Sequence, residues 1–112
     1  MNYFRYMETG ISDKSLQAIA NVVYSNARVQ DAKIFGSRAI GTFHQGSDID
    51  ICLIGEDLTL TDLNRIASDL DELNIPQLID LVNFRTIKNE NLIKHISHNS
   101  IRLTPSPTAL VL

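Results

Sequence analysis

The chain has 112 residues, of which 44% are hydrophobic and 21% are charged, and these values fit one small globular domain with a single core. Its formal net charge of −3 argues against a general nucleic-acid binder, which would usually carry a basic stripe, although it does not exclude a small phosphorylated ligand held by local geometry. No apolar run approaches the roughly 18 to 20 residues of a membrane span, and the N-terminal segment MNYFRYMETG has no apolar secretory core, so we expect a cytoplasmic protein.

The first predicted elements are a helix, a strand and a long turn. The helix covers about residues 13–26, where apolar side chains recur at helical spacing after Ser12, whose hydroxyl suits the N-cap position. The strand covers residues 29–35 and ends in large apolar side chains. Residues 36–47 hold three glycines and indicate a turn that contains one short helical turn at residues 37–40.

The second predicted strand covers residues 48–55 and begins with two aspartates one residue apart. After these aspartates the segment is apolar almost without interruption, which is typical of a strand covered on both faces. Cys52 lies in this apolar run and is the only cysteine, so it cannot form an internal disulfide. We expect Cys52 to be a buried small side chain rather than a catalytic thiol.

Two helices and a third strand complete the predicted elements. Residues 59–73 form a helix in which Thr59 and Asp62 resemble a capping box with Asp in place of Glu. A strand at about residues 77–83 and a helix at about residues 89–97 follow. The predicted inward stripe of the 59–73 helix consists of Leu60, Leu63, Ile66, Leu70 and Leu73.

Strands that alternate with helices predict an α/β or α+β fold, with a small mixed sheet and helices packed on it. The first two strands should pair antiparallel, because the link between them is too short for a helical crossover. The second and third strands enclose a helix and should pair parallel, with a right-handed crossover. We expect one domain over residues 1–112, with its core at about 12–103. The segments 1–11 and 104–112 are expected to be loose tails or docked segments, the first on a partner through Tyr3, Phe4 and Tyr6 and the second by its last apolar residues.

Asp48 and Asp50 should face the same side of the second strand, because alternate residues of a strand point the same way. Two ionised carboxylates at this separation repel each other, and one would take up a proton unless a cation lay between them. Mg²⁺ suits such a position, since it prefers carboxylate oxygens and is often shared with substrate phosphates. The pair therefore predicts a metal site, with an ordinary turn that enters a strand as the alternative.

Asp80 is the candidate third carboxylate, since a charged residue is out of place in an otherwise apolar strand. Three carboxylates on one face can hold two Mg²⁺ ions about 3.5 to 4 Å apart for in-line phosphoryl displacement. Gly36 and Ser37 predict a phosphate-binding turn, because glycine lets backbone N–H groups approach phosphate oxygens. Arg38 and Ser47 are further candidates for contacts with the phosphates.

Each of these features has a simpler alternative when it is taken alone. The Gly-Ser pair could be an ordinary turn, and Asp80 could pair with a lysine or cap a neighbouring backbone group. His95 and His98 lie three residues apart on the last helix, but no nearby cysteine completes a zinc set, so we expect solvated or helix-end side chains. His44 is expected to be an exposed loop residue. Only the combination predicts a site that binds a nucleoside triphosphate and transfers part of it.

The stretch FGSRAIGTFHQGSDIDICLIG resembles the signature of the nucleotidyltransferases related to DNA polymerase beta: Gly-Ser, ten residues, then Asp-x-Asp. The third acidic residue of that family, on a later strand, matches Asp80. The resemblance covers about residues 12–103, and the length and element order are similar to those of the minimal nucleotidyltransferases. It implies the polymerase beta-like fold and a transfer of AMP from ATP.

The resemblance also implies roles for the site residues. Asp48 and Asp50 would hold two Mg²⁺ ions, for which Mn²⁺ could substitute, together with the triphosphate of ATP. Asp80 would complete the site of the ion that activates the attacking hydroxyl, and Gly36 and Ser37 would bind the β- and γ-phosphates.

A biological setting is implied as well. Minimal members are commonly encoded beside a helical HEPN-domain protein and act as the antitoxin of a toxin–antitoxin pair, in some cases by adding AMP to a tyrosine of the toxin. The resemblance thus implies a HEPN-domain partner and a homo- or hetero-oligomer. A non-catalytic antitoxin that acts by complex formation and a transferase for a small acceptor such as an aminoglycoside stay open as alternatives. Many minimal members have a second arginine where this chain has Ile40, which leaves efficiency and acceptor choice open.

Overall fold

The structure is a computed structural model that describes residues 9–105. Each predicted helix and strand is present, with ends that differ by one or two residues, while η1 and β4 were not predicted. The predictions for the two tails concern mainly residues outside this described part. None of the helices within residues 9–105 is long and apolar enough to cross a membrane. In chain order the elements are α2 (Asp13–Tyr24), β1 (Asp31–Phe35), α3 (Ser37–Ile40), β2 (Ile49–Ile54), α4 (Leu60–Asp71), β3 (Ile79–Asn83), the 3-10 turn η1 (Phe84–Thr86), α5 (Glu90–Asn99) and β4 (Ile101–Arg102).

The strands form one mixed sheet in the order β3-β2-β1-β4. As predicted, β1 and β2 pair antiparallel, and β2 and β3 pair parallel. The strand β4 escaped prediction because it has only two residues and is defined by its pairing with β1, which is distant in sequence. The fold class is therefore α+β, with helices packed on a small mixed sheet, which confirms the prediction.

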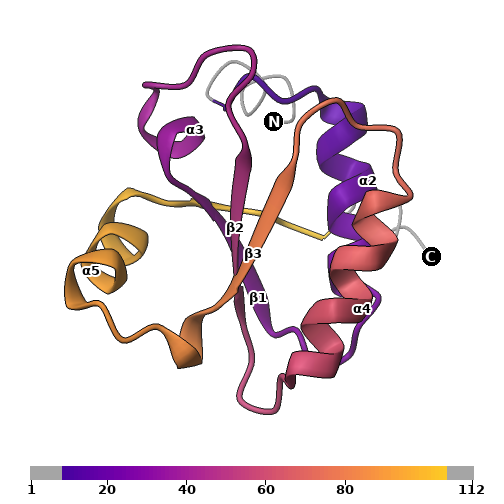
Figure 1. The fold of residues 1–112 in the computed structure, drawn as a ribbon, viewed down its shortest axis with the longest axis vertical. Helices are drawn as coiled ribbons and strands as arrows, with labels where there is room; N and C mark the ends of the chain where they lie inside the picture. The colour runs from indigo at the N-terminus through magenta and orange to yellow at the C-terminus, as the bar shows by residue number, and fades with distance from the viewer. Residues whose placement is uncertain (1–8, 106–112) are drawn as a thin grey trace.

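Helices cover both faces of the sheet. Figure 1 shows α2 and α4 together on one side of the strands and α5 on the opposite side. The smaller core cluster, on the α5 side, is formed by Phe35, Cys52 and Ile96. A second, larger cluster lies on the other face of the sheet, and β2 contributes to both. The strand β2 is therefore covered on both faces, as its apolar run predicted. The larger cluster lies between the sheet and the α2–α4 pair, and its most buried members include Ile19, Val23, Ile34, Ile49, Ile51 and Leu53.

Two expectations about single side chains have different outcomes. Burial raises the pKa of the Cys52 thiol to about 11, so the thiol stays protonated at neutral pH and has the structural role that was predicted. The inward position predicted for Leu60 is wrong, because this first residue of α4 is 74% exposed. The first apolar side chain of α4 that packs against the core is Leu63.

The N-terminus of α4 carries the predicted capping box. The Thr59 hydroxyl accepts a hydrogen bond from the Asp62 N–H at 3.1 Å, and the Asp62 carboxylate accepts one from the Thr59 N–H at 3.0 Å. Asn26 and Arg28 donate to the other carboxylate oxygen, Asp62 Oδ1. The hydrogen bond from the Thr59 backbone, followed by that from Asn26, lowers the pKa of Asp62 to about 2.

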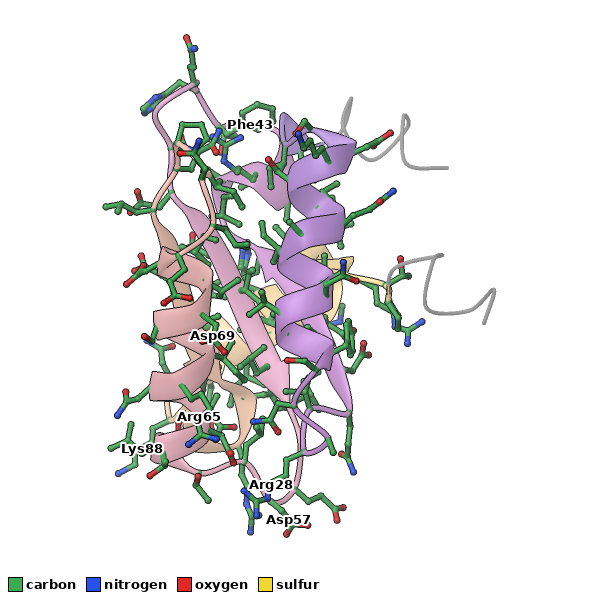
Figure 2. All side chains as sticks on the ribbon, turned by 90° about the vertical axis from the view of Figure 1, so that its right-hand side faces the viewer. Arg28, Phe43, Asp57, Arg65, Asp69 and Lys88 are labelled. Atoms are coloured by element: carbon green, nitrogen blue, oxygen red, sulfur yellow. The ribbon has the colours of Figure 1, made fainter. Side chains whose placement is uncertain are left out.

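We expect acid to remove the contribution of Asp62 to stability in a defined pH range. Because the pKa of Asp62 is lower in the folded than in the unfolded chain, its stabilising effect is fully present above about pH 4 and is lost as the pH falls through about 2. Urea unfolding at pH 6 and pH 2.5 should therefore show a stability gap between wild type and Asp62→Asn that shrinks at the lower pH. Asp69→Asn, which changes an exposed carboxylate of the same helix (Figure 2), is the control. A gap that is equal at both pH values would contradict this prediction.

Candidate active site

The end of β1 and the starts of β2 and β3 meet at one end of the sheet, next to α3 (Figure 1). In the antiparallel register Phe35 pairs with Asp50, so the Gly-Ser turn that follows Phe35 lies beside Asp50. In the parallel register Asp50 pairs with Asp80. Asp48 precedes Asp50 by two residues at the start of the same strand. The strand pairing therefore brings the Gly-Ser turn together with Asp48, Asp50 and Asp80 at this end of the sheet, which is called the acidic edge below.

Asp80 lies in a different environment from the one expected. The strand β3 is the outer strand of the sheet, and the Asp80 side chain is exposed. The expectation that Asp80 is a charge out of place in an apolar strand is therefore wrong, although Asp80 does lie next to Asp50. An exposed carboxylate on an edge strand needs no internal partner, so Asp80 is accessible to a ligand that approaches from solvent.

Asp50 is the most buried of the three carboxylates. Burial, followed by the negative charges of Asp80 and Asp48, raises the pKa of Asp50 above its usual value. The carboxylates are thus close enough to repel one another, and a cation between them would relieve this repulsion. Within residues 9–105, no three side chains among His, Cys, Asp and Glu converge closely enough to hold a metal ion unaided. The donors still fit Mg²⁺, which binds one or two carboxylates and completes its shell with water and phosphate oxygens.

Gly36 occupies a position that only glycine can take without strain. Its φ of +76° lies in the left-handed region, and a Cβ added there would lie 2.3 Å from Asp50 Oδ2. The missing side chain lets the turn approach the Asp50 carboxylate directly. The helix α3 begins at Ser37, the next residue, so the turn and the first backbone N–H groups of α3 lie beside the acidic residues.

His95 is the residue of this region that sequence analysis missed. Its Nε2 accepts a hydrogen bond from the Gly36 N–H at 3.2 Å, and its ring meets the Phe35 ring edge-on with centroids 6.4 Å apart. The expectation of a solvated or helix-end side chain is therefore wrong for His95, but it holds for His98, which is exposed and contacts the Lys94 carbonyl at 2.9 Å. The only sequence signal for His95 is its position directly before the buried Ile96 on an amphipathic helix.

Arg38 points into the protein rather than toward the acidic residues. Its side chain is 1% exposed, its Nε and Nη2 donate to the Ser47 carbonyl at 3.1 and 2.9 Å, and its Nη1 donates to the Thr9 carbonyl at 2.9 Å. Its guanidinium also lies 5.0 Å from the centre of the Phe43 ring, which Figure 2 labels. The N–H groups of Arg38 therefore donate to backbone carbonyls, and its contact with a phosphate stays a prediction.

Ser47 belongs to the same loop. Its hydroxyl accepts a hydrogen bond from the His44 N–H at 3.0 Å, while its carbonyl is the acceptor for Arg38. His44 itself is exposed, as expected. Arg38 and Ser47 thus hold together the loop that leads into Asp48, and residues 9–11, which were expected to be loose, are packed against this loop through Thr9.

We expect Arg38→Lys to destabilise the protein by about 2 kcal/mol, because an ammonium cannot serve several carbonyl acceptors in the directions that the guanidinium does, and buried carbonyls would lose their partners. Urea unfolding of Arg38→Lys and of Arg65→Lys, a change at an exposed position (Figure 2), should separate this effect from a general arginine effect. Equal stabilities of the two variants would contradict the structural role of Arg38.

The surface next to Asp48 is hollowed only slightly. A hollow of about 210 Å³ lies there, and its lining includes Pro76 and Leu78. Leu78 is 72% exposed and precedes Asp80 by two residues on the same chain segment, and Ile40, at the end of α3, is 50% exposed. An apolar side chain that faces solvent, that of Leu78, therefore lies near Asp48 in the lining of this hollow.

A comparison with protein-family models matches residues 17–106 to the family described as Polymerase beta, Nucleotidyltransferase. The matched segment contains the Gly-Ser turn and all three carboxylates. A search of curated proteins finds no match.

Several solved structures are similar to the chain. A chain of a toxin–antitoxin crystal structure with AMP-PNP is 25% identical, with a TM-score of 0.66 over 84% of this chain and 76% of that chain. A chain of a mutant MntA toxin–antitoxin complex is 26% identical, with a TM-score of 0.62 over 81% and 72%. A chain of the complex between a tri-AMPylated Shewanella oneidensis HEPN toxin and its MNT antitoxin is 20% identical, with a TM-score of 0.55 over 86% and 77%, and supports the fold alone. Since the family model covers most of its length, the chain belongs to the polymerase beta nucleotidyltransferase family.

Proposed function

We propose that the chain is a Mg²⁺-dependent nucleotidyltransferase that transfers AMP from ATP to a hydroxyl group of a partner protein, and that it serves as the antitoxin of a HEPN-domain toxin. The observation that supports this proposal most is the pairing of Asp50 with Asp80 beside the Gly-Ser turn. Further support comes from similar chains in solved toxin–antitoxin structures, one crystallised with AMP-PNP and one from a mutant MntA complex.

Asp48, Asp50 and Asp80 are the residues that would hold two Mg²⁺ ions, or Mn²⁺, together with oxygens of the triphosphate. When bound, such ions neutralise part of the triphosphate charge and lower the pKa of an attacking hydroxyl. The raised pKa of Asp50 agrees with this assignment, since burial and then the negative charges of Asp80 and Asp48 disfavour its ionised form, and a bound cation would offset that charge repulsion.

The Gly-Ser turn would bind the β- and γ-phosphates of the nucleotide, which leave as pyrophosphate. Gly36 lets the turn approach Asp50, and Ser37 offers its hydroxyl and N–H groups to the β- and γ-phosphates. With the triphosphate fixed between the turn and the carboxylates, the acceptor oxygen forms a bond to the α-phosphorus. The bond from that phosphorus to the bridging oxygen breaks, pyrophosphate leaves, and the hydroxyl proton passes to solvent.

The shape of the edge favours a protein over a small molecule as the acceptor. Asp48 and Asp80 are exposed, and the hollow beside Asp48 measures about 210 Å³. Pockets that enclose a drug-sized ligand usually measure about 300 to 1,000 Å³. The described residues would therefore enclose little of the surface of an aminoglycoside. A partner protein, by contrast, would enclose its own acceptor hydroxyl with its own surface.

Labelled ATP tests the reaction directly. With Mg²⁺ and a HEPN-domain protein from the same genetic locus, label from [α-³²P]ATP should appear on that protein, whereas label from [γ-³²P]ATP should appear only in pyrophosphate. Label on the partner from [γ-³²P]ATP would indicate phosphoryl transfer and would contradict the proposal. The absence of any label on the partner would contradict it as well. Label on an aminoglycoside without any protein partner would favour the small-acceptor alternative.

A further inference from the structure

The Gly36 N–H, which lies in the proposed phosphate turn, already has a partner within the protein. It donates to His95 Nε2 at 3.2 Å, and the two residues come from distant parts of the chain, the end of β1 and the middle of α5. An N–H group has one proton to donate. As long as the His95 bond exists, the Gly36 N–H is not available to a phosphate oxygen, and the contacts to phosphate fall to Ser37 and the residues after it.

The position of the His95 ring is set by the packing of α5. The next residue, Ile96, is 1% exposed and belongs to the cluster with Phe35 and Cys52, so this helix is anchored on the sheet directly beside the acidic edge. The His95 ring is itself partly buried and rests edge-on against the Phe35 ring. Since Nε2 accepts a hydrogen bond, the ring proton of the neutral imidazole lies on Nδ1 in this arrangement.

The bond fixes the peptide unit that joins Phe35 to Gly36. Directly after it, the unusual backbone angles of Gly36, φ 76° and ψ −154°, redirect the chain into α3. The Gly36 backbone lies close to the Asp50 carboxylate, since an added Cβ would lie 2.3 Å from Asp50 Oδ2, and the His95 bond restrains the turn from the α5 side. The turn is thus held from both sides, with Ser37 as the first residue beyond the restraint.

We propose that His95 is a positioning residue for the phosphate turn: through the Gly36 N–H it sets the direction in which Ser37 and the start of α3 meet the triphosphate. The inference rests on the proposed function, because it assumes that this turn binds phosphate. Loss of the His95 acceptor should weaken nucleotide binding and raise KM for ATP more than it lowers kcat, since His95 acts on the turn and not on the reacting atoms.

Two variants of His95 separate its acceptor atom from its packing. His95→Phe keeps a flat ring against Phe35 but has no acceptor, whereas His95→Gln loses the ring but can offer its Oε1 near the position of Nε2. Binding of Mg²⁺ and the non-hydrolysable analogue α,β-methylene-ATP, measured by calorimetry without any acceptor protein, should weaken by about five- to tenfold in His95→Phe and recover in His95→Gln. Urea unfolding should show that His95→Phe is more stable than His95→Gln, the opposite of their order in nucleotide binding, because phenylalanine preserves the ring contact. The matched controls are His98→Phe and His98→Gln, at an exposed position of the same helix.

Hydrogen exchange of the Gly36 amide, followed by ¹⁵N NMR, tests the bond without any nucleotide. The amide should be protected in wild type and His95→Gln and should exchange faster in His95→Phe. Unchanged protection in His95→Phe, or nucleotide binding by that variant at or above wild-type affinity, would overturn the inference. If wild type still transfers AMP in that case, the proposed function stands without it. If wild type binds no nucleotide at all, the proposed function fails and the role of His95 fails with it.

Discussion

Asp50→Asn should lower the rate of AMP transfer by about a thousandfold or more, because it removes the charge that lies between Asp48 and Asp80 and would face both the metal ions and the triphosphate. The side chain keeps its size, so the fold should be retained. Transfer of label from [α-³²P]ATP to the partner protein measures the effect. The control is Asp57→Asn, which changes an exposed carboxylate in the link between β2 and α4 (Figure 2).

The same variant should be more stable than wild type at pH 7 when no divalent cation is present. Because the pKa of Asp50 is raised in the folded protein, the folded state loses stability as the pH rises from the pKa of the unfolded chain through that of the folded one. Asparagine does not ionise, so the free energy of unfolding of the variant does not fall in this way. Urea unfolding should therefore show a stability gain for Asp50→Asn at pH 7 that disappears near pH 3. An inactive variant that is also less stable would point to misfolding instead of lost chemistry.

Asp50→Asn also separates catalysis from simple complex formation. If neutralisation of the toxin depends on transfer, cells that express the toxin with Asp50→Asn should stop growing, while those with Asp57→Asn should grow. If Asp50→Asn neutralises the toxin as well as wild type does, the antitoxin acts by masking its partner, and the catalytic account of neutralisation is contradicted.

Gly36→Ala is expected to reduce transfer by about a hundredfold or more, because a displacement of reacting groups by about 1 Å can have an effect of that size. The added Cβ would lie 2.3 Å from Asp50 Oδ2, and the residue would keep a φ of +76° that alanine rarely adopts. Relief of the overlap must move either the turn or the Asp50 carboxylate, and both movements disturb the edge at which the triphosphate would bind.

Gly41→Ala is the matched control for this change. Gly41 also has a positive φ, +82°, but nothing lies within 4 Å of an added Cβ. Both variants should lose about 1 to 2 kcal/mol of stability through the backbone conformation, whereas only Gly36→Ala should lose transfer activity and nucleotide binding. Similar losses of transfer in the two variants would contradict the role of the close approach between Gly36 and Asp50.

The sequence by itself determined the local features of this protein and the directions of its central strands. Helical spacing and capping residues locate α2 and α4, and the links on either side of β2 require an antiparallel pair and then a parallel pair. The alternation of side chains along β2 orients Asp48 and Asp50 together. These features depend on residues within about one element of each other, so a linear pattern is sufficient to predict them.

Only the tertiary structure decided the features that join distant segments. It shows that β3 is the outer strand of the sheet and that the Asp80 side chain is exposed. It also shows that Arg38 turns inward to the Thr9 and Ser47 carbonyls, and that His95 holds the Gly36 N–H. The energy of each of these hydrogen bonds depends on the burial and orientation of its two groups. These groups are far apart in sequence, and only folding brings them to hydrogen-bonding distance.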